Sequence, residues 1–563
     1  MPVRMIDTDV GREIAGAAGF CRMSGPVEVE ATMHAARRGT RRAASSALSD
    51  RQALWAFALG VVLVTAGVLL HLPMFLMGRM THFRLAGMPM GHDMLAGMGF
   101  IIGGCAIAAY GLLPRDIAKQ VATARDLEVA APEDAHLAWP HWQLMGALVA
   151  ALVIDVMKPA ALGFALPGMA SEYAVPQATA SLVPFFALVG TVVGSVVWGF
   201  AADIYGRKAS IMLSAVMFVG TAICGAMPSL AWNIGMCFMM GAAAGGMLPV
   251  AYALLAEMMP SRHRGWSLVL VGGLGALGGY FAASGFSALL QPFFGWRILW
   301  LLNLPTGLIL VLLGRFIPES AKFLVAHGRE AEAHAVMTRF GARMRAVTAR
   351  PTPSTGKVHL TGLSLIGKLA ALSIAALCWG LVNFGLLLWL PTDLLAKGYS
   401  MAVSSRLLAE STLIALPTVF AAAWLYSRWS TKWSVVASLA ITIAGLTGVL
   451  MLELGLLASP VLPVALLIVG TNGLIAMVLP YTAESFPLRV RGRATGWVAA
   501  CTKAGGVGAQ FLAILALVPA LGVSAVLIAI PTGLALILLV RFGRETLGRD
   551  LRELDGPIAS EAF

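Results

Sequence analysis

Charge is scarce in this chain: Asp, Glu, Lys and Arg make up 12% of its 563 residues, whereas hydrophobic residues make up 58%. A soluble domain carries roughly twice that charged fraction, so the composition argues against a protein surrounded by water. Apolar runs of about 20 residues recur along the sequence, each long enough to cross a bilayer as a helix. Strand-type alternation of apolar and polar residues is absent. We therefore expect an all-α polytopic membrane protein rather than a membrane barrel.

Cysteine is also scarce, and the six present form no C-x-x-C pair. This spacing excludes a disulfide framework and a paired-cysteine metal site. Thiols inside apolar spans behave as small hydrophobic groups. The phosphate-binding pattern G-x-x-x-x-G-K-[ST] is absent too, which disfavours an ATP-driven pump. We expect no enzymatic activity and no cofactor. The cysteines in apolar spans are Cys105, Cys224, Cys237, Cys378 and Cys501.

The net charge of +12 does not indicate a nucleic-acid partner, because the basic residues lie in alternate loops between apolar spans. Positive charge gathers in the cytoplasmic loops of membrane proteins. The pattern therefore predicts a cytoplasmic side and a lipid bilayer as the surroundings. The basic residues concerned are Arg37, Arg38, Arg41, Arg42, Arg207, Lys208, Arg262, Arg264, Arg489, Arg491 and Arg493.

The apolar spans divide the chain into six segments. Two spans come first, twelve follow in two groups of six, and a basic segment separates the groups. An even number of spans places both termini in the cytoplasm. The predicted segments are a disordered cytoplasmic tail at 1–50, two extra transmembrane helices with a connector at 51–141, a six-helix bundle at 142–317, a cytoplasmic loop with a surface helix near 329–345 at 318–365, a second six-helix bundle at 366–540, and a cytoplasmic tail at 541–563.

One motif occurs twice. Glu257-Met-Met-Pro-Ser-Arg-His-Arg264-Gly and Glu484-Ser-Phe-Pro-Leu-Arg-Val-Arg491-Gly share the pattern E-x-x-P-x-x-x-R-G and lie 227 residues apart. Two other features repeat at nearly this interval, Asp203 with Ser427 and Glu319 with Glu545. A large membrane-embedded half has therefore been duplicated, which is the layout of a carrier that rocks one half against the other.

The repeated motifs carry a family resemblance. They are the loop Gly199-Phe-Ala-Ala-Asp203-Ile-Tyr-Gly206-Arg207-Lys208, the two E-x-x-P-x-x-x-R-G loops, Pro318-Glu319-Ser320, and Glu545-Thr-Leu-Gly548. Together they resemble the major facilitator superfamily, in its sugar-porter and metabolite–proton symporter branches, over residues 142 to about 552. The resemblance implies a major facilitator fold of two six-helix bundles, to which this chain adds two N-terminal helices.

The resemblance also implies a cytoplasmic gate, in which charges at helix ends link the two halves and separate as they rock. Simple interfacial anchoring is the alternative. The second-half loop has Ser427 where the first has Asp203, so its contribution should be weaker. The predicted gate residues are Asp203, Gly206, Arg207, Lys208, Glu257, Arg264, Glu319, Glu484, Arg491 and Glu545.

Charged residues deep in a membrane are costly and mark functional sites. Asp155 lies about 20 Å into the first span of the first bundle, and Lys158 follows three residues later, on the same helical face. They form either a self-neutralising ion pair or a proton acceptor with an anion anchor beside it. The resemblance favours the second reading, because symporters of this kind carry an acidic residue in this span. Pro159 supplies a local break in the helix.

Lys503 lies about 10 Å from the cytoplasmic end of the eleventh span of the twelve, beside Gly505, Gly506 and Gly508. It either snorkels to the membrane surface or faces a cavity. The resemblance implies an anionic substrate, since organic-anion carriers use a basic residue here. The remaining candidates for a mixed polar and aromatic pocket are Trp379, Asn383, Trp389, Asn472 and Gln510, with Glu410 as a second possible proton site.

The loop after the first span is rich in methionine and histidine. Met88, Met90, His92 and Met94 are soft ligands that suit copper(I), although methionine is also a common packing residue. A soft-metal carrier is therefore one alternative to our interpretation, and a non-transporting sensor with carrier architecture is another. Our main prediction is a monomeric, proton-coupled symporter that takes up a small organic anion or carboxylate metabolite across a bacterial inner membrane.

Overall fold

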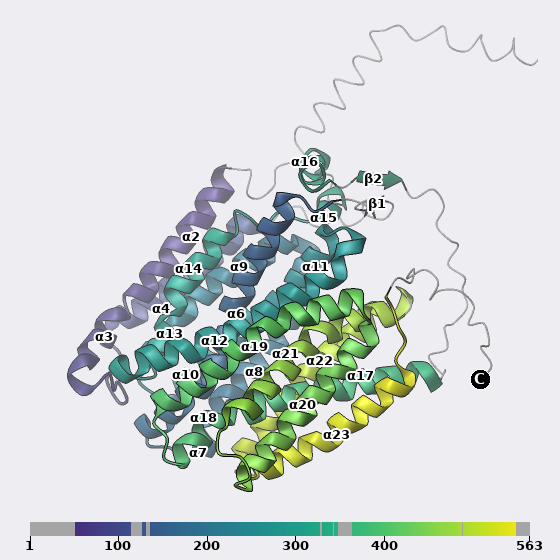
Figure 1. Ribbon diagram of the computed structural model, residues 1–563. Coiled ribbons are helices and arrows are strands. Elements are labelled where there is room, and N and C mark those ends of the chain that lie inside the picture. The colour runs from purple at the N-terminus through teal and green to yellow at the C-terminus, as the bar shows by residue number, and fades with distance from the viewer. Residues whose placement is uncertain are drawn as a thin grey trace, which may run out of the picture.

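The computed structural model of the protein describes residues 51–113, 127–130, 136–326, 329–341, 343–346, 363–486 and 488–547. The predicted tails, at 1–50 and beyond 547, lie outside these ranges, and so do most of the connector and part of the central loop. The described chain is almost entirely helical (Figure 1).

The chain begins with a helical hairpin of α2 (Arg51–Leu69) and α4 (His92–Leu112), joined through α3 (Leu72–Met77) and η1 (Gly78–Thr81). We call residues 51–112 the leading hairpin. Its two long helices are in backbone contact: a Cβ atom on Gly60 would lie 2.6 Å from the carbonyl oxygen of Gly104, and one on Gly67 would lie 2.5 Å from that of Gly97. Only glycine permits so close an approach, as in other membrane helix pairs.

The first bundle, the N-terminal half, follows the hairpin. Its six spans are α6; α8, which is preceded by α7; α9 with η2; α10 with α11; α12; and α13 with α14. Their bounds are α6 (Trp139–Glu172), α7 (Gln177–Ala180), α8 (Leu182–Tyr205), α9 (Arg207–Gly220), η2 (Thr221–Ala226), α10 (Leu230–Ala244), α11 (Met247–Met258), α12 (Ser261–Phe294), α13 (Ile298–Leu301) and α14 (Asn303–Leu313).

The second bundle, the C-terminal half, has six spans in the same order. Its first span contains a π-helical turn, η3, and such turns often occur at functional sites. The bounds are α17 (Leu363–Leu381), η3 (Val382–Leu386), α18 (Leu387–Ala396), α19 (Met401–Arg428), α20 (Thr431–Glu453), α21 (Val461–Ser485), α22 (Leu488–Ile514) and α23 (Leu521–Phe542).

The fourteen predicted spans are all accounted for. Twelve helical stretches in the described residues are long and apolar enough to cross a membrane, and they include both helices of the leading hairpin. The shorter apolar stretch Ile298–Leu313 and the less apolar α22 pack alongside them and complete the set.

Between the bundles lie two short helices, α15 (Ala321–Ala326) and α16 (Glu330–Phe340), at one end of the molecule (Figure 1). The predicted surface helix is thus present, and it ends at Gly341. Phe340 packs edge-on against His141 at the start of α6, with ring centroids 5.1 Å apart. Two short strands that we did not predict, β1 (Leu127–Ala130) and β2 (Arg343–Ala346), pair antiparallel beside these helices.

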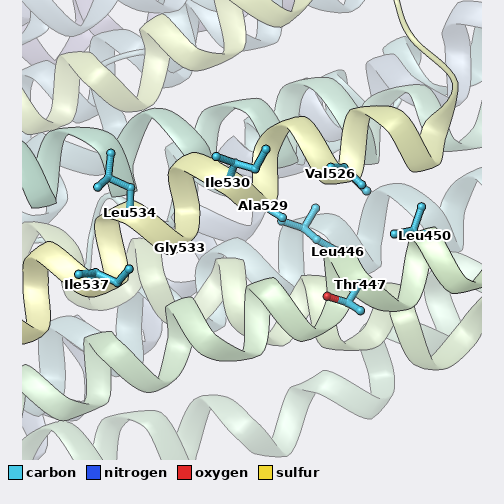
Figure 2. A pocket seen from close by; sticks show the side chains of 10 residues that line it. Leu446, Thr447, Leu450, Val526, Ala529, Ile530, Gly533, Leu534 and Ile537 are labelled. Atoms are coloured by element: carbon cyan, nitrogen blue, oxygen red, sulfur yellow. The ribbon is translucent and has the colours of Figure 1, made fainter.

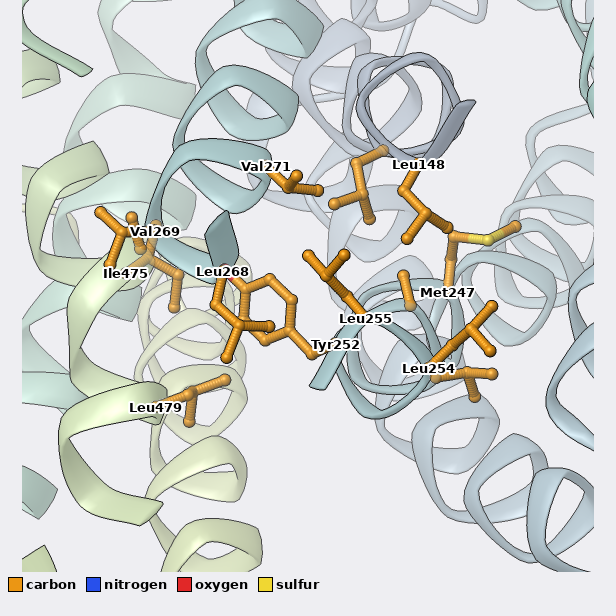
Figure 3. Packing of buried hydrophobic residues seen from close by; sticks show 14 of the residues in the cluster. Leu148, Met247, Tyr252, Leu254, Leu255, Leu268, Val269, Val271, Ile475 and Leu479 are labelled. Carbon is orange, nitrogen blue, oxygen red and sulfur yellow. The ribbon is translucent and has the colours of Figure 1, made fainter. Parts of the chain in front are cut away.

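The two halves meet along four main helix pairs: α12 with α19, α12 with α21, α6 with α18, and α8 with α22. Each pair joins one element of the first bundle to one of the second, as expected for duplicated halves around a central axis. Figure 3 shows part of the packing at this interface, where Leu268 and Val269 of α12 lie near Ile475 and Leu479 of α21. These buried apolar contacts hold the two halves together at this interface.

Candidate functional site

A cavity of about 400 Å³ lies between the two halves. It is walled by α6, α8, α11 and α12 from the first half, and by α17, η3, α18, α21 and α22 from the second. Its lining is mostly apolar with a small set of polar groups, the usual make-up of a small-molecule site. The polar and tryptophan side chains in the lining are Asp155, Thr191, Ser195, Tyr252, Tyr280, Trp379, Asn383, Asn472, Thr502 and Lys503.

Asp155 and Lys503 are the charged residues of this lining within the described chain, and they come from opposite halves. Asp155 is 7% exposed, and its Oδ1 has no hydrogen-bond partner among the described residues. Lys503 holds its Nζ 5.8 Å from the ring centroid of Phe384. A carboxylate and an ammonium group thus face one enclosed space from two bodies that a carrier moves relative to each other.

The sequence of α6 explains the setting of Asp155. Pro159 lies four residues later and has no backbone N–H, so it cannot donate the helical hydrogen bond to the carbonyl of Asp155. Pro159 itself lines the cavity. The carbonyl of Asp155 therefore lacks its usual helical donor beside the carboxylate, although α6 continues through Pro159 without a break.

Lys158 does not line the cavity, contrary to our expectation of an anion anchor. Its side chain is buried and donates to the hydroxyl of Thr221 (2.8 Å) and the carbonyl of Phe218 (3.2 Å), with Nζ over the Phe218 ring. Three residues rotate a helix by about 300°, about 60° short of a full turn. That offset is enough to turn Lys158 into the bundle interior while Asp155 faces the cavity.

The other predicted pocket residues divide into two groups. Trp379, Asn383 and Asn472 line the cavity as expected. Gln510 instead lies behind the wall, where its Nε2 donates to the carbonyl of Phe384 in η3. Trp389 also lies outside the lining, with its indole nitrogen buried.

Glu410 is misplaced in our prediction. It is 45% exposed on α19 and pairs with Arg406 of the same helix at 2.8 Å, away from the cavity. The two residues are four apart and occupy one helical face. An internal proton site at Glu410 is therefore not supported by its position.

Sequence reasoning missed most of the aromatic lining. Phe164 and Tyr280 from the first half pack with ring centroids 6.2 Å apart, and Trp379 and Phe384 from the second half meet edge-on at 5.6 Å. Tyr252 is the fifth ring of the lining. The sequence offered one signal for these rings. Tyrosine is rare, with 8 in the chain, and Tyr252 and Tyr280 both lie within apolar spans of the first half.

The predicted gate residues of the first half come together at one end of the bundle, which we call the gate end. Glu319 accepts hydrogen bonds from the backbone N–H groups of Arg207 (2.8 Å) and Lys208 (3.2 Å) at the start of α9. Arg207 pairs with Glu257 at 3.1 Å and with Asp203 at 3.2 Å. Burial raises the pKa of Glu319, and the backbone hydrogen bonds oppose that rise.

Gly206 makes this arrangement possible. Its φ is +104°, and a Cβ atom there would lie 2.3 Å from a carboxylate oxygen of Glu319. A residue with a side chain would be strained in this conformation and would also displace the carboxylate. The turn between α8 and α9 therefore requires glycine.

The second half forms a related arrangement with neutral partners. Glu545 accepts from the N–H (2.9 Å) and hydroxyl (2.6 Å) of Thr431 at the start of α20, and also from the Ser430 hydroxyl. Although burial alone raises the pKa of Glu545, these hydrogen bonds lower it to about 2. Glu484 accepts from Tyr426 (2.8 Å) and Thr546 (2.8 Å).

Contact between the halves at the gate end runs through α12. A Cβ atom on Gly265, next to Arg264, would lie 3.6 Å from Tyr426 and 3.8 Å from Glu484. Arg264 of one repeat is therefore close to Glu484 of the other. Arg491 lies in α22, and its side chain is outside the described residues.

The methionine-rich loop is a packing element in this structure. Met94 is buried, and Met88 and Met90 pack against an apolar cluster shared with α9. His92 is exposed. Within the described ranges, no group of three or more His, Cys, Asp or Glu residues could hold a metal ion.

A second hollow, of about 460 Å³, lies between α20 and α23 (Figure 2). Apart from Thr447, its lining is aliphatic or glycine, with Leu446, Ile530 and Leu534 among the labelled side chains. It has no charged group and involves helices of one half only. It therefore lacks the polar contacts that would select a hydrophilic solute.

Comparison with known proteins agrees with this geometry. The Major Facilitator Superfamily model matches residues 145–510. A niacin transporter of Acinetobacter baylyi is 26% identical over 433 residues, covering 74% of this chain and 96% of that protein. A 4-hydroxybenzoate transporter of the same organism is 30% identical over 290 residues, covering 48% of this chain and 61% of that protein.

The fold is also that of a solved carrier. The structure of a proton:xylose symporter bound to 6-bromo-6-deoxy-D-glucose aligns with a TM-score of 0.59 at 17% sequence identity, covering 74% of this chain and 98% of that one. At that identity the likeness concerns the fold. It agrees with the fold of duplicated bundles. The chain belongs to the major facilitator superfamily and is a multi-pass membrane transporter, not an enzyme.

Proposed function

We propose that the protein is a proton-coupled symporter that takes up a small organic anion, and that the anion is an aromatic monocarboxylate. The observation that carries this proposal is the pair of opposite charges, Asp155 and Lys503, that faces the central cavity from the two halves. The relatives named for niacin and 4-hydroxybenzoate transport support the substrate class, and so do the five aromatic rings of the lining.

The two charges supply a coupling mechanism. With Asp155 ionised and Lys503 protonated, the empty cavity is neutral overall. A substrate carboxylate brings one negative charge, which is costly in a low-dielectric space unless it is compensated. Protonation of Asp155 removes one negative charge and leaves Lys503 free to bind the substrate. Proton and anion therefore load together, and the loaded cavity is again neutral when the halves rock.

The rings and amides of the lining position the rest of the molecule. Trp379 and Phe384 form an aromatic surface beside Lys503, against which a flat ring can stack. Asn383 and Asn472 offer hydrogen bonds to ring substituents. The charges at the gate end then open and close the cytoplasmic side, with both termini in the cytoplasm of a bacterial cell.

Transport in proteoliposomes tests this function. Benzoate, 4-hydroxybenzoate and nicotinate serve as labelled probes. We expect an inward proton gradient to drive their accumulation, and Asp155→Asn to abolish accumulation while counterflow exchange continues. Accumulation by Asp155→Asn at the wild-type level would reject the coupling role of the carboxylate.

A second pair of variants tests the anion site. We expect Lys503→Ala to raise KM for benzoate by at least about tenfold, because a charge-assisted contact contributes about 1.5–3 kcal/mol. Lys503→Arg keeps the charge and should retain much of the affinity. Equal behaviour of the two variants would place Lys503 outside the binding site.

No described contact favours copper transport, since Met88 and Met90 are engaged in packing.

A further inference from the structure

The leading hairpin is held by a carboxylate of the first transport helix. Glu172, the last residue of α6, accepts hydrogen bonds from the backbone N–H groups of Leu85 (2.7 Å) and Ala86 (3.0 Å) in the hairpin loop. The next residue of the loop, Gly87, donates its N–H to the carbonyl of Pro228 at 3.0 Å. Leu85 is fully buried at this junction. The loop is therefore docked by its backbone on the end of the bundle opposite the gate.

The same carboxylate forms the most buried ion pair among those described. Arg297, at the start of α13, lies 2.7 Å from Glu172, and the two side chains are 1% and 5% exposed. Arg297 also donates to the carbonyls of Gly225 (3.2 Å) and Met227 (2.9 Å), and Trp296 donates its indole N–H to Glu172 (2.8 Å). Glu172 thus joins the hairpin to α6, α13 and the η2–α10 turn at one point.

The hairpin is also packed along its length against the same half. A Cβ atom on Gly220 of α9 would lie 2.8 Å from Ile101 of α4 and 3.7 Å from Val64 of α2, and among the described residues outside its own helix these are its neighbours within 4 Å. The hairpin loop reaches α12 as well, because the rings of Phe83 and Phe294 have centroids 5.5 Å apart. All these partners belong to the N-terminal half.

The anchor at Glu172 has a consequence for the cavity. Pro159 and Pro167 lie within α6 between Asp155 and Glu172, and each removes one helical hydrogen bond. A helix weakened in this way can bend between its two ends. Phe164, which lines the cavity, lies between the two prolines. The direction of this segment depends on what holds its end.

We propose that the leading hairpin is a fixed brace of the N-terminal half, and that Glu172 is the positioning residue through which it sets the outer segment of α6. The hairpin and the first bundle then move as one body of eight helices. The substrate does not touch the hairpin. The hairpin acts on transport through the orientation of α6.

Two variants separate the brace from the bundle in different ways. Gly220→Leu adds a side chain whose Cβ meets Ile101 and Val64, and so pushes on the hairpin. Glu172→Gln removes the charged acceptor at the loop, but it also removes the counter-charge of Arg297. Gly220→Leu therefore decides whether a change in α6 comes from the hairpin. Gly235→Leu is the matched control, because Gly235 lies on α10 of the same half with nothing within 4 Å of its Cβ position.

Hydrogen–deuterium exchange of the purified full-length protein gives a readout that needs no substrate. We expect Gly220→Leu and Glu172→Gln to speed exchange by about threefold or more, both in the hairpin loop and in α6 peptides spanning 160–172. In proteoliposomes, both variants should also raise KM for benzoate, while Gly235→Leu changes neither measurement. Faster exchange confined to the hairpin, with α6 unchanged, would show that the hairpin is a passenger and overturn the proposal. Because exchange is measured without transport, this outcome is separate from a failure of the substrate assignment.

Discussion

The two halves share a fold but differ in the chemistry at their ends. At the gate end of the N-terminal half, Arg207 pairs with Glu257 at 3.1 Å. The corresponding position 224 residues later is Thr431, and Glu484 there accepts hydrogen bonds from hydroxyl groups instead. At the opposite end, the first half buries the ion pair of Glu172 and Arg297. Among the described contacts, the two copies share a backbone plan, whereas the buried and half-buried ion pairs at these matched positions lie in the first copy.

This difference indicates unequal roles. An ion pair depends on salt and protonation, and it is costly to leave half-made, whereas hydroxyl contacts cost less to break. The charged half therefore keeps its own helices together more strongly. In the second half, the carboxylates of Glu484 and Glu545 accept hydrogen bonds. In the described contacts, neither is paired with a cation of the same half. Four comparisons of variants probe this contrast, in descending order of expected effect.

The largest effect is expected at the end opposite the gate. Glu172→Gln leaves the buried guanidinium of Arg297 without its counter-charge, which typically costs about 3–5 kcal/mol. In the second half, Glu453 accepts an N–H bond from Gly522 at 2.5 Å. Glu453→Gln should therefore cost only about 1 kcal/mol. Thermal unfolding of the detergent-solubilised variants measures both. Equal losses would mean that the ion pair adds nothing beyond an ordinary hydrogen bond.

The next effect is at the gate. Arg207→Thr makes the first half resemble the second and strands Glu257, which is 21% exposed. We expect a loss of about 2 kcal/mol, below that of a fully buried pair because solvent reaches the site. Thr431→Val, the reciprocal test, removes a neutral hydroxyl and should cost about 1 kcal/mol. The same unfolding assay compares them, and a larger loss for Thr431→Val would contradict the contrast.

The third prediction concerns pH. The pKa of Glu545 is about 2, below its usual value, so its contribution to stability is present above about pH 4.5 and is lost as the pH falls toward 2. The pKa of Glu319 is raised above its usual value, so its contribution to stability is present at low pH. This contribution is lost as the pH rises through the raised pKa. As the pH is lowered, the difference in melting temperature between wild type and Glu545→Gln should narrow. The corresponding difference between wild type and Glu319→Gln should widen. Melting temperatures from pH 7 to 3.5 test the two signs.

The smallest effect is expected at Asp203. Its side chain is 74% exposed beside Arg207, and exposed pairs contribute about 0–1 kcal/mol. Asp203→Asn should therefore change stability little, as should Ser427→Asp at the matching position of the second half. Any effect on uptake without a change in melting temperature would assign Asp203 to the gate rather than to packing.

The sequence predicted the duplicated architecture well, because repeated motifs and span lengths are one-dimensional signals. It also located Asp155, Lys503, Trp379, Asn383 and Asn472 in the cavity wall. The direction of a side chain on a buried helix was harder to predict. Lys158 and Glu410 were chosen for their charge, and each faces away from the cavity because of the helix rotation at its position.

The glycine spacing of the leading hairpin is a signal in the sequence that we did not use. Glycines recur every seven residues in the leading hairpin, at Gly60 and Gly67 and again at Gly97, Gly104 and Gly111, and they mark the contact face of α2 and α4. The π-helical turn η3 has no such signature. Its Phe384 carbonyl accepts a hydrogen bond from Gln510 of α22, 126 residues later in the chain. Contacts of that kind are decided by tertiary packing.

The docking of the loop on Glu172 bears on biogenesis. The leading hairpin leaves the ribosome before every helix that it later touches, and its glycine-lined pair can form without them. Glu172 emerges next, and its carboxylate can bind the waiting N–H groups of Leu85 and Ala86 before Arg297 has been synthesised. The leading hairpin can thus serve as a template for the first bundle, whose helices follow it in order of synthesis.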